Sequence, residues 1–343
     1  MTATSDVGTH ARRQSRWHWS EIAFWILALA CAFLFPSRYL IMTDIVRLGL
    51  FAMSLDLILG YAGIVSLGHA AFFGVGAYSA GLFALHGIIT EPVVALLVAG
   101  LVATTLGFCT SFLVIRGADL TRLMVTLGIA LLLEALAERF SDITGGTDGL
   151  QGIEMQPILG LFAFDMFGKA GFFYSLGVLF ALFLLARRIV HSPFGLSLRA
   201  IRNNPLRAAA IGIPVNRRLI AIYTLSAFYA GIAGALFTQT TALASLDVFA
   251  FERSADLLLV LVIGGTGYLY GGLIGAVVFK MLQEVFSTIT PQYWQFWIGL
   301  VLVVIVLVGR PRLHRWALWA PNLVIRQFGA RKAILAAPES DAP

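Results

Sequence analysis

Seven arginines lie in one polar segment of the chain, residues 187–218, which contains no Asp or Glu. They are Arg187, Arg188, Arg199, Arg202, Arg207, Arg217 and Arg218. Guanidinium groups can extend into lipid headgroups, and they can also bind a complementary partner protein. Because short loops rich in Arg and Lys stay on the cytoplasmic side of a membrane, the segment predicts an inner loop.

The loop has capping signals for a short helix of its own. Asn204 is a favourable N-cap, Pro205 suits the first helical position, and Gly212 with Pro214 provides a stop. The pattern predicts a helix over 205–211. An apolar stripe falls at helical spacing on Leu206, Ala209, Ala210 and Ile213. Two interpretations remain open: a surface helix with arginines among the headgroups, or a docking helix for a groove on a soluble partner.

Three ionisable residues fall inside apolar runs and could couple transport to an ion. They are Asp56, Glu134 and Lys280. A charge at the bilayer centre costs roughly 2.5–3.5 kcal/mol on insertion scales, so such a residue indicates a function unless it lies near a helix end. Glu134 and Asp56 each lie close to an expected helix end, where an interface charge explains them, whereas Lys280 is deeper. His69 is either packed in the protein or part of a solute path.

Enzyme signatures are absent from the sequence. It contains neither a His-Glu-x-x-His metal motif nor a nucleophile elbow. The turn from Thr144 to Gly149 lacks the lysine and the spacing of a nucleotide-binding loop. Cys31 and Cys109 both lie in apolar runs, which argues against a disulfide framework or a metal site. We therefore expect no catalytic residue, no metal site and no cofactor in this chain.

The composition is that of a polytopic membrane protein. Of 343 residues, 59% are hydrophobic and only 12% are charged. The net charge of +6 arises in loops and tails, where membrane orientation explains it, so it does not indicate a nucleic-acid partner. We expect an all-α fold with about ten transmembrane helices, glycine-broken segments and both termini in the cytoplasm.

Helix positions follow from the apolar runs and from the requirement that the basic loops lie on the cytoplasmic side of the membrane. Residues 1–20 are expected to form a basic cytoplasmic tail, 21–310 the transmembrane domain with a cytoplasmic loop over 187–218, and 311–343 a cytoplasmic tail with an interfacial helix at Trp316 and Trp319. Helices are expected near residues 21–35, 44–60, 93–115, 123–136, 172–185, 219–238 and 296–308, with a short inner loop holding Arg116, Asp119 and Arg122.

The three remaining helices lie next to two glycine-rich breaks. Residues 60–81 predict an irregular segment that leads into a helix, and residues 257–280 predict two helices that meet at the glycines 264–267. Unwound backbone at membrane depth is tolerated only inside protein or beside a water-filled cavity, so the first break is a candidate for the translocation path. Both breaks fall on the inner side, whereas an inverted repeat places them on opposite sides. The pattern therefore gives little support to an inverted repeat.

Four ordered motifs together resemble the permeases of branched-chain amino acid ABC transporters. They are the stretch from Gly60 to Tyr78, the turn from Thr144 to Leu150, the loop from Ser192 to Ile213 and the glycines from Gly264 to Gly267. The resemblance covers about residues 42–310. It implies a membrane subunit of an ATP-driven importer in the prokaryotic inner membrane, working by alternating access.

The resemblance also implies partners and site residues. The partners are a sister permease, two ATPase subunits that bind ATP and Mg, and an extracytoplasmic solute-binding protein. The inner loop is similar to a coupling helix, with Leu206 where older patterns have a glutamate. Its implied ATPase contacts are Arg199, Arg202, Asn203, Asn204, Arg207, Ala208, Ala209 and Gly212; the implied path residues are Ser66, Gly68, His69, Gly264, Gly265 and Gly267; and the outer mouth is at Thr147 and Asp148.

The solute and the energy source stay open at this point. Relatives of such permeases handle branched-chain amino acids, urea, short amides or aromatic acids, and the sister subunit can be identical or different. The alternative is a self-sufficient secondary carrier or channel that uses Asp56, Glu134 or Lys280. An intramembrane enzyme is a third, more remote, hypothesis.

Overall fold

The computed structural model describes residues 19–308, apart from positions 118, 159 and 166. Within these residues every regular element is a helix or a short helical turn, so the predicted all-α class is confirmed. Most of the expected N-terminal tail, all of residues 311–343 and the interfacial helix expected at Trp316 and Trp319 lie outside the described residues.

The helices and helical turns follow one another along the chain with short connections. In chain order they are α2 (Trp19–Leu34), η1 (Pro36–Arg38), α3 (Tyr39–Ala62), α4 (Ala70–Leu85), α5 (Pro92–Arg116), α6 (Asp119–Arg139), α7 (Ser141–Thr144), η2 (Gly146–Asp148), α8 (Lys169–Val190), α9 (Pro193–Asn203), α10 (Pro205–Ala210), α11 (Val215–Thr241), η3 (Leu246–Val248), α12 (Phe251–Gly264), α13 (Leu269–Ile289) and α14 (Trp294–Val308).

Six stretches are long and apolar enough to cross a membrane by length and composition. They are Pro36–Ala62, Pro92–Arg116, Leu120–Arg139, Lys169–Val190, Val215–Thr241 and Leu269–Ile289. Three shorter apolar helices, Glu21–Leu34, Ala70–Leu85 and Trp294–Ile305, are below the length of about 20 residues that a single helix needs to span a bilayer. The described residues therefore form a polytopic helical membrane protein with six candidate spans, and the predicted count of ten is not confirmed.

Two helix starts differ from the prediction in a way that matters for the charged residues. α3 begins at Tyr39 rather than near Asp44, so Asp44 and Arg47 lie inside the helix. α6 begins at Asp119, so Arg122 belongs to a helix and not to the predicted inner loop. In both cases the polar residue was taken as the edge of an apolar run, although the helix continues through it.

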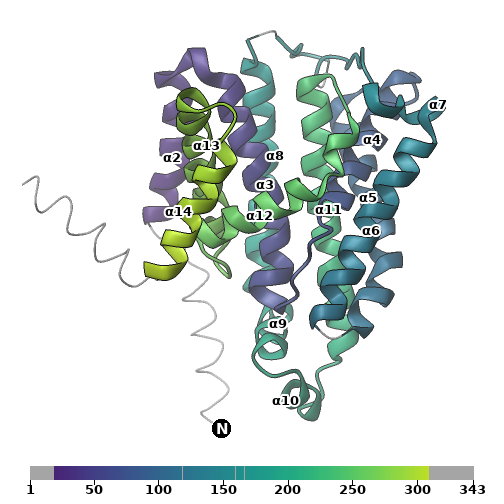
Figure 1. The fold of residues 1–343 in the computed structure, drawn as a ribbon, viewed down its shortest axis with the longest axis vertical. Helices are drawn as coiled ribbons and strands as arrows, with labels where there is room; N and C mark the ends of the chain where they lie inside the picture. The colour runs from purple at the N-terminus through teal and green to yellow at the C-terminus, as the bar shows by residue number, and fades with distance from the viewer. Residues whose placement is uncertain (1–18, 118, 159, 166, 309–343) are drawn as a thin grey trace, which may run out of the picture. The chain divides into compact units, whose positions relative to one another are not determined.

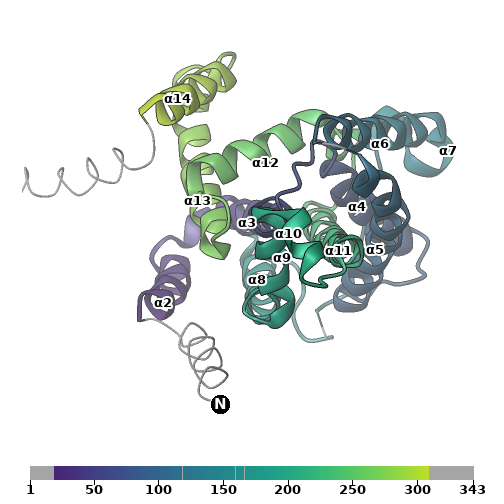
Figure 2. The ribbon, with the colours of Figure 1, turned by 90° about the horizontal axis from the view of Figure 1, so that it is seen from below.

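The chain divides into two compact units, residues 1–281 and 282–343. In the first unit α11 packs against α3, α4 and α5, and α8 packs on α3 (Figures 1 and 2). Tyr223, Tyr229 and Phe72 are among the largest side chains that are fully buried there. A Cβ at Gly234 would overlap the carbonyl oxygen of Phe73, so glycine lets α11 approach α4 closely. In the second unit Phe286 stacks on Trp297 at 6.2 Å.

The first unit has two ends, which we name after the elements there. α9 and α10 lie at the α10 end, and α7 lies at the opposite, α7 end (Figure 1). α3 runs to the α10 end, where the irregular segment 63–69 turns back into α4, as the glycine pattern predicted. α12 and α13 meet at residues 265–268, also as predicted, but α12 lies across the long helices (Figures 1 and 2).

Segment 242–250 is the structural counterpart of the first break, and the sequence pattern did not predict it. α11 runs to the α7 end, and the segment 242–250 then turns back into α12 (Figure 1). The starts of the two returning helices meet, because the backbone N–H of Ala70 donates to Ser254 Oγ at 2.9 Å. The two breaks thus begin at opposite ends, as in inverted repeats. The glycine pattern paired two other breaks instead, because segment 242–250 contains no glycine.

Candidate functional site

The arginine-rich loop folds into two helices joined at Asn204. Asn204 Oδ1 accepts a hydrogen bond from the backbone N–H of Arg207 at 2.9 Å, and Pro205 is the first residue of α10. α10 ends at Ala210, ahead of Gly212, whose φ of 86° is left-handed. The predicted cap and helix are therefore confirmed. α9 was not predicted, although Ser192 and Pro193 give it the same kind of start signal.

The tip of this loop exposes apolar side chains. Leu206 is 83% exposed and Ile211 is 71% exposed. Of the residues expected to contact a partner, Arg202, Asn203, Asn204, Arg207, Ala209 and Gly212 are exposed, Arg199 is half-buried, and Ala208 is buried against the rest of the loop. Ala208 therefore lies on the inner face of α10 and not on the face that an external partner could reach.

Two arginines of α9 contact the end of α3. Arg202 Nη1 donates a hydrogen bond to the carbonyl oxygen of Gly60. The guanidinium of Arg199 lies over the ring of Tyr61, 5.4 Å from its centroid. Both arginines were expected to contact an ATPase. In the structure their guanidinium groups hold the loop to the last turn of α3.

The end of α3 also holds the glycine break between α12 and α13. Asp56, which is fully buried, accepts a hydrogen bond at Oδ1 from the backbone N–H of Gly267 at 2.7 Å. A Cβ at Gly60 would come within 2.8 Å of the Cα of Gly267, so only glycine permits this approach. We name Gly60, Asp56, Arg202 and Gly267 the junction. It joins α9, α3 and the glycine break.

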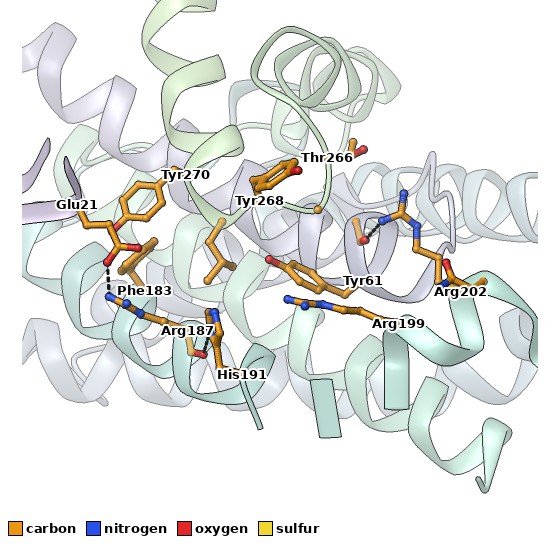
Figure 3. Close-up of a pocket in the computed structure, with 14 residues that line it drawn as sticks. Glu21, Tyr61, Phe183, Arg187, His191, Arg199, Arg202, Thr266, Tyr268 and Tyr270 are labelled. Carbon is orange, nitrogen blue, oxygen red and sulfur yellow. Dashed lines mark hydrogen bonds and ion pairs between the residues drawn. The ribbon is translucent and has the colours of Figure 1, made fainter. Parts of the chain in front are cut away.

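A polar cavity of about 650 Å³ opens beside the junction (Figure 3). Arg187, Arg199 and Arg202 come from α8 and α9. Across the cavity lie Tyr268, just before α13, and Tyr270, in the first turn of α13 (Figure 3). Its other lining residues are Glu21, Gly60, Tyr61, Phe183, His191, Asn203, Thr266, Gly267 and Leu269. Of the glycines predicted to line a path at this break, Gly267 lines the cavity.

α2 is attached at the same place. Arg187 Nη1 forms an ion pair with Glu21 Oε2 at 2.6 Å. Trp25 packs edge-on against Phe183 at 5.3 Å, and Phe24 packs against Tyr270 at 5.4 Å. The first helix of the described chain is therefore held to α8 and α13 beside the cavity.

The first break, residues 63–69, is buried inside the unit at Ile64, Ser66, Gly68 and His69, whereas Gly63 is exposed. His69 is fully buried and its Nε2 lies 2.8 Å from Ser54 Oγ and 3.3 Å from Ser226 Oγ. A Cβ at Gly68 would overlap the carbonyl oxygen of Thr126 in α6. Ser66 is buried as well. In this structure the three predicted path residues Ser66, Gly68 and His69 pack between helices and do not line the cavity described above.

The turn at the α7 end is exposed. Thr147 and Asp148, the residues predicted at an outer mouth, are both exposed. The turn is fixed to segment 242–250, because Leu150 and Ala244 exchange two backbone hydrogen bonds of 2.7 and 3.1 Å. Gly149, with a φ of 69°, allows this contact, since a Cβ there would overlap the carbonyl oxygen of Ala244.

A group of charged residues lies where α3, α12 and α13 meet, and of these the sequence pattern singled out only Lys280. We name it the charge cluster; its members are Asp44, Arg47, Asp247, Arg253, Asp256 and Lys280. Arg47 forms an ion pair with Asp44, and its Nη1 also donates to Thr240 Oγ1 at 2.5 Å. Lys280 Nζ lies 3.9 Å from Asp44 Oδ2. The helical spacing of Asp44 and Arg47 was the available signal.

Among the described residues, no group of three or more His, Cys, Asp or Glu side chains could hold a metal ion. Glu134, the remaining predicted charge, is half-buried in α6. Cys31 and Cys109 are free thiols in separate helices. The described residues bring charged groups together at the junction, at the cavity and in the charge cluster.

Comparison with known proteins gives consistent matches over most of the chain. A family model described as the permease component of a branched-chain amino acid transport system matches residues 38–306. The permease protein LivM of the high-affinity branched-chain amino acid transport system of Escherichia coli (strain K12) is 26% identical over 283 residues, which cover 76% of this chain and 65% of that protein. LivM of Salmonella typhimurium is 27% identical over the same shares.

A sugar permease is also among the relatives. The ribose import permease protein RbsC of Bacillus subtilis (strain 168) is 30% identical over 173 residues, 46% of this chain and 53% of that protein. This chain spans 65% of the length of the two LivM proteins, just under two thirds. No solved structure matches the chain.

Proposed function

Because this chain belongs to the family of branched-chain amino acid transport permeases, we propose that it is one membrane subunit of an ATP-driven importer for small polar solutes. It would form half of the translocation path, with a sister permease as the other half. Two cytoplasmic ATPase subunits would bind ATP and Mg, and a solute-binding protein would deliver the solute. The complex would lie in the inner membrane of a prokaryote, with the α10 end in the cytoplasm.

The loop of α9 and α10 is the observation that carries this proposal. One face of the loop exposes Leu206 and Ile211 with alanines between them, and its other face is bonded through Arg202 to the carbonyl oxygen of Gly60. A helix with an exposed apolar tip suits a groove on a soluble subunit. An ATPase movement at the tip would pass through Arg202 to the end of α3.

Through the junction, the same movement would also reach the glycine break between α12 and α13. Gly60 packs on Gly267, and Asp56 of the same helix holds the backbone of Gly267. A displacement of α9 would therefore move α3 and the glycine break between α12 and α13 together. Alternating access needs such an element with two arrangements that the ATPase state selects.

The outer half of the cycle would use the opposite end. The turn with Thr147 and Asp148 would receive solute from the binding protein, because it is exposed and rigidly fixed to segment 242–250. The branched-chain amino acids are the first candidates for the solute. A ribose permease among the relatives keeps the solute class of this chain a separate question.

Co-purification tests the proposal. The full chain, solubilised in mild detergent, should pull down ATPase subunits, and solute-loaded binding protein should stimulate their ATP hydrolysis. A chain that purifies without any ATPase and moves solute on an ion gradient in proteoliposomes would overturn it. That result would favour a self-sufficient carrier with Asp56, Glu134 or Lys280 as coupling residues.

A further inference from the structure

The polar cavity beside the junction carries an excess of positive charge (Figure 3). Its lining includes three guanidinium groups, those of Arg187, Arg199 and Arg202. Among the described residues that line it, Glu21 is the only acid, and its carboxylate pairs with Arg187. One further carboxylate, that of Asp56, is fully buried in α3, where it accepts a hydrogen bond from the cavity wall. Against these two carboxylates, the three guanidinium groups leave one positive charge in excess.

Two of the guanidinium groups are held by uncharged partners. Arg202 donates to the carbonyl oxygen of Gly60, and Arg199 lies over the ring of Tyr61. These contacts orient the two side chains but neutralise neither charge. A guanidinium group has five N–H donors in a planar fork that matches the oxygens of a phosphate group, and the bond to Gly60 uses one donor of Arg202. Arg202 is exposed and Arg199 is half-buried, so both remain accessible to an anion.

The cavity lies where several helices begin or end. Glu21 is in the first turn of α2, Tyr61 and Arg187 are in the last turns of α3 and α8, and Tyr270 is in the first turn of α13. Because α3, α8 and α13 are long and apolar enough to span a bilayer, their ends reach the headgroup region. Tyr268, which is 74% exposed, is of a residue type that prefers this depth. Basic pockets between membrane helices at the cytoplasmic surface bind phosphate-bearing headgroups.

Apolar surface continues from the cavity along two of its helices. α8 exposes Leu184 and Leu185, which are within one turn of Arg187. α2 exposes Ile22, which follows Glu21 directly. Acyl chains can pack on such surfaces while a headgroup lies among the arginines. A lipid therefore suits the surroundings of the cavity better than a soluble anion does.

We propose that this cavity binds a phosphate group at the inner surface of the membrane. The phosphate oxygens accept hydrogen bonds from Arg199 and Arg202, and the single negative charge of a phosphodiester balances the excess positive charge. The volume of about 650 Å³ is in the usual range for small-ligand sites. Two sources share this chemistry, an anionic phospholipid headgroup and a soluble phosphate, and the apolar surfaces of α2 and α8 favour the lipid. The placement at the inner surface rests on the orientation given in the proposed function, whereas the binding chemistry does not.

The test measures binding to the full chain in detergent, without any partner subunit. The delipidated protein is titrated with dioleoyl phosphatidylglycerol or with dioleoyl phosphatidylcholine, whose choline balances the charge of its phosphate. Native mass spectrometry gives the apparent Kd of the first lipid bound. In a parallel titration with inorganic phosphate, the melting temperature and the displacement of bound phosphatidylglycerol are measured.

Two cavity variants and two matched controls are compared with the unmodified chain. The first variant combines Arg199→Gln with Arg202→Gln, and its control combines Arg207→Gln with Arg217→Gln, which removes two exposed cations outside the cavity. The second variant, Tyr268→Glu, places a negative charge at an exposed position of the lining. Its control is Leu161→Glu, at a residue 77% exposed near the α7 end. Because Tyr268 is so exposed, Tyr268→Glu should fold normally even if the double arginine variant does not.

We expect phosphatidylglycerol to bind at least about tenfold more tightly than phosphatidylcholine, because each basic residue at the membrane surface adds to the attraction for an anionic lipid. Both cavity variants should weaken the binding of phosphatidylglycerol by about tenfold or more, and both controls should keep it within about twofold. If inorganic phosphate has no effect on the unmodified chain, the source is a lipid headgroup. If it raises the melting temperature and displaces phosphatidylglycerol, and the cavity variants abolish both effects, the site also takes soluble phosphate.

Two outcomes would overturn the inference. One is equal affinity for the two lipids together with no effect of inorganic phosphate. The other is a preference for phosphatidylglycerol that a folded Tyr268→Glu variant retains in full. The measurement involves neither an ATPase nor a transported solute, so a chain that shows the preference but purifies without an ATPase would reject the proposed function and not the phosphate site.

Discussion

Arg202 of α9 donates a hydrogen bond to the carbonyl oxygen of Gly60 in the last turn of α3, across 142 residues of sequence. The bond crosses from the loop at the α10 end to a helix that lies in the core of the first unit. Gly60 in turn packs on Gly267, so the bond connects the loop to the break between α12 and α13. The junction is thus a mechanical connection within the subunit.

The first prediction concerns this connection. Arg202→Gln shortens the side chain and removes the charge, so the bond to Gly60 should be lost. A hydrogen bond to a charged group contributes about 1.5–3 kcal/mol, so solute uptake per ATP hydrolysed should fall about tenfold or more. ATPase subunits should still co-purify, because the tip of α10 is unchanged. Arg217→Gln, at an exposed position in the first turn of α11, is the control, and equal uptake in both variants would contradict the prediction.

A second prediction separates two roles of Asp56. Its Oδ1 accepts the N–H of Gly267, and an asparagine oxygen can accept the same bond. We expect Asp56→Asn to retain most ATP-driven uptake, whereas Asp56→Ala should lower uptake and thermal stability by leaving the Gly267 N–H without its acceptor, at a cost of about 1–3 kcal/mol. Uptake and melting temperature are measured on the same preparations. If Asp56→Asn is as inactive as Asp56→Ala, the carboxylate charge itself is required and an ion-coupling role gains support.

Local signals explain what the sequence could predict. The cap at Asn204 with Pro205 fixed α10 to within a residue, because both residues act on their own helix start. The glycines at 264–267 likewise located the meeting of α12 and α13. Segment 242–250 was missed because its turn is set by contacts with Leu150 and with Gly74, against which Phe249 packs, and not by a local glycine.

Residue roles that depend on distant partners could not be predicted in the same way. The sequence pattern predicted only that Arg202 is a cation of an exposed loop. The fold shows that its side chain reaches the carbonyl oxygen of Gly60. The sequence did not decide whether His69 lines a solute path or packs inside the protein. Its position depends on Ser54 and Ser226, which come from two other helices. The charge cluster was overlooked because Asp44 was taken as a helix start, which hid Arg47 inside the membrane-spanning segment.

The third prediction concerns the first break. A Cβ at Gly68 would overlap the carbonyl oxygen of Thr126, and backbone cannot move away as a flexible side chain can. Gly68→Ala should therefore destabilise the subunit by several kcal/mol and reduce the folded yield in detergent. Gly128→Ala lies on the same helix as Thr126, with no atom within 4 Å of the new Cβ, and should be neutral or stabilising by about 0.5–1 kcal/mol. Size-exclusion profiles and melting temperatures of the two variants compare them directly; equal melting temperatures would mean that α6 can shift away from the break.

The last prediction concerns the apolar tip of the loop. Leu206 is 83% exposed on α10, so replacing it should cost little folding energy. Leu206→Asp places a charge where an apolar groove of an ATPase would bind, and burying that charge without a partner should weaken ATPase association by tenfold or more, about 1.4 kcal/mol for each factor of ten. Leu161→Asp, at a residue 77% exposed near the α7 end, is the matched control and should leave association unchanged. Co-purified ATPase per permease gives the readout. Because the melting temperature should be the same for both variants, a selective loss with Leu206→Asp would identify α10 as a docking element, whereas equal ATPase recovery would remove the tip from the interface and leave the arginines of the loop as determinants of membrane orientation.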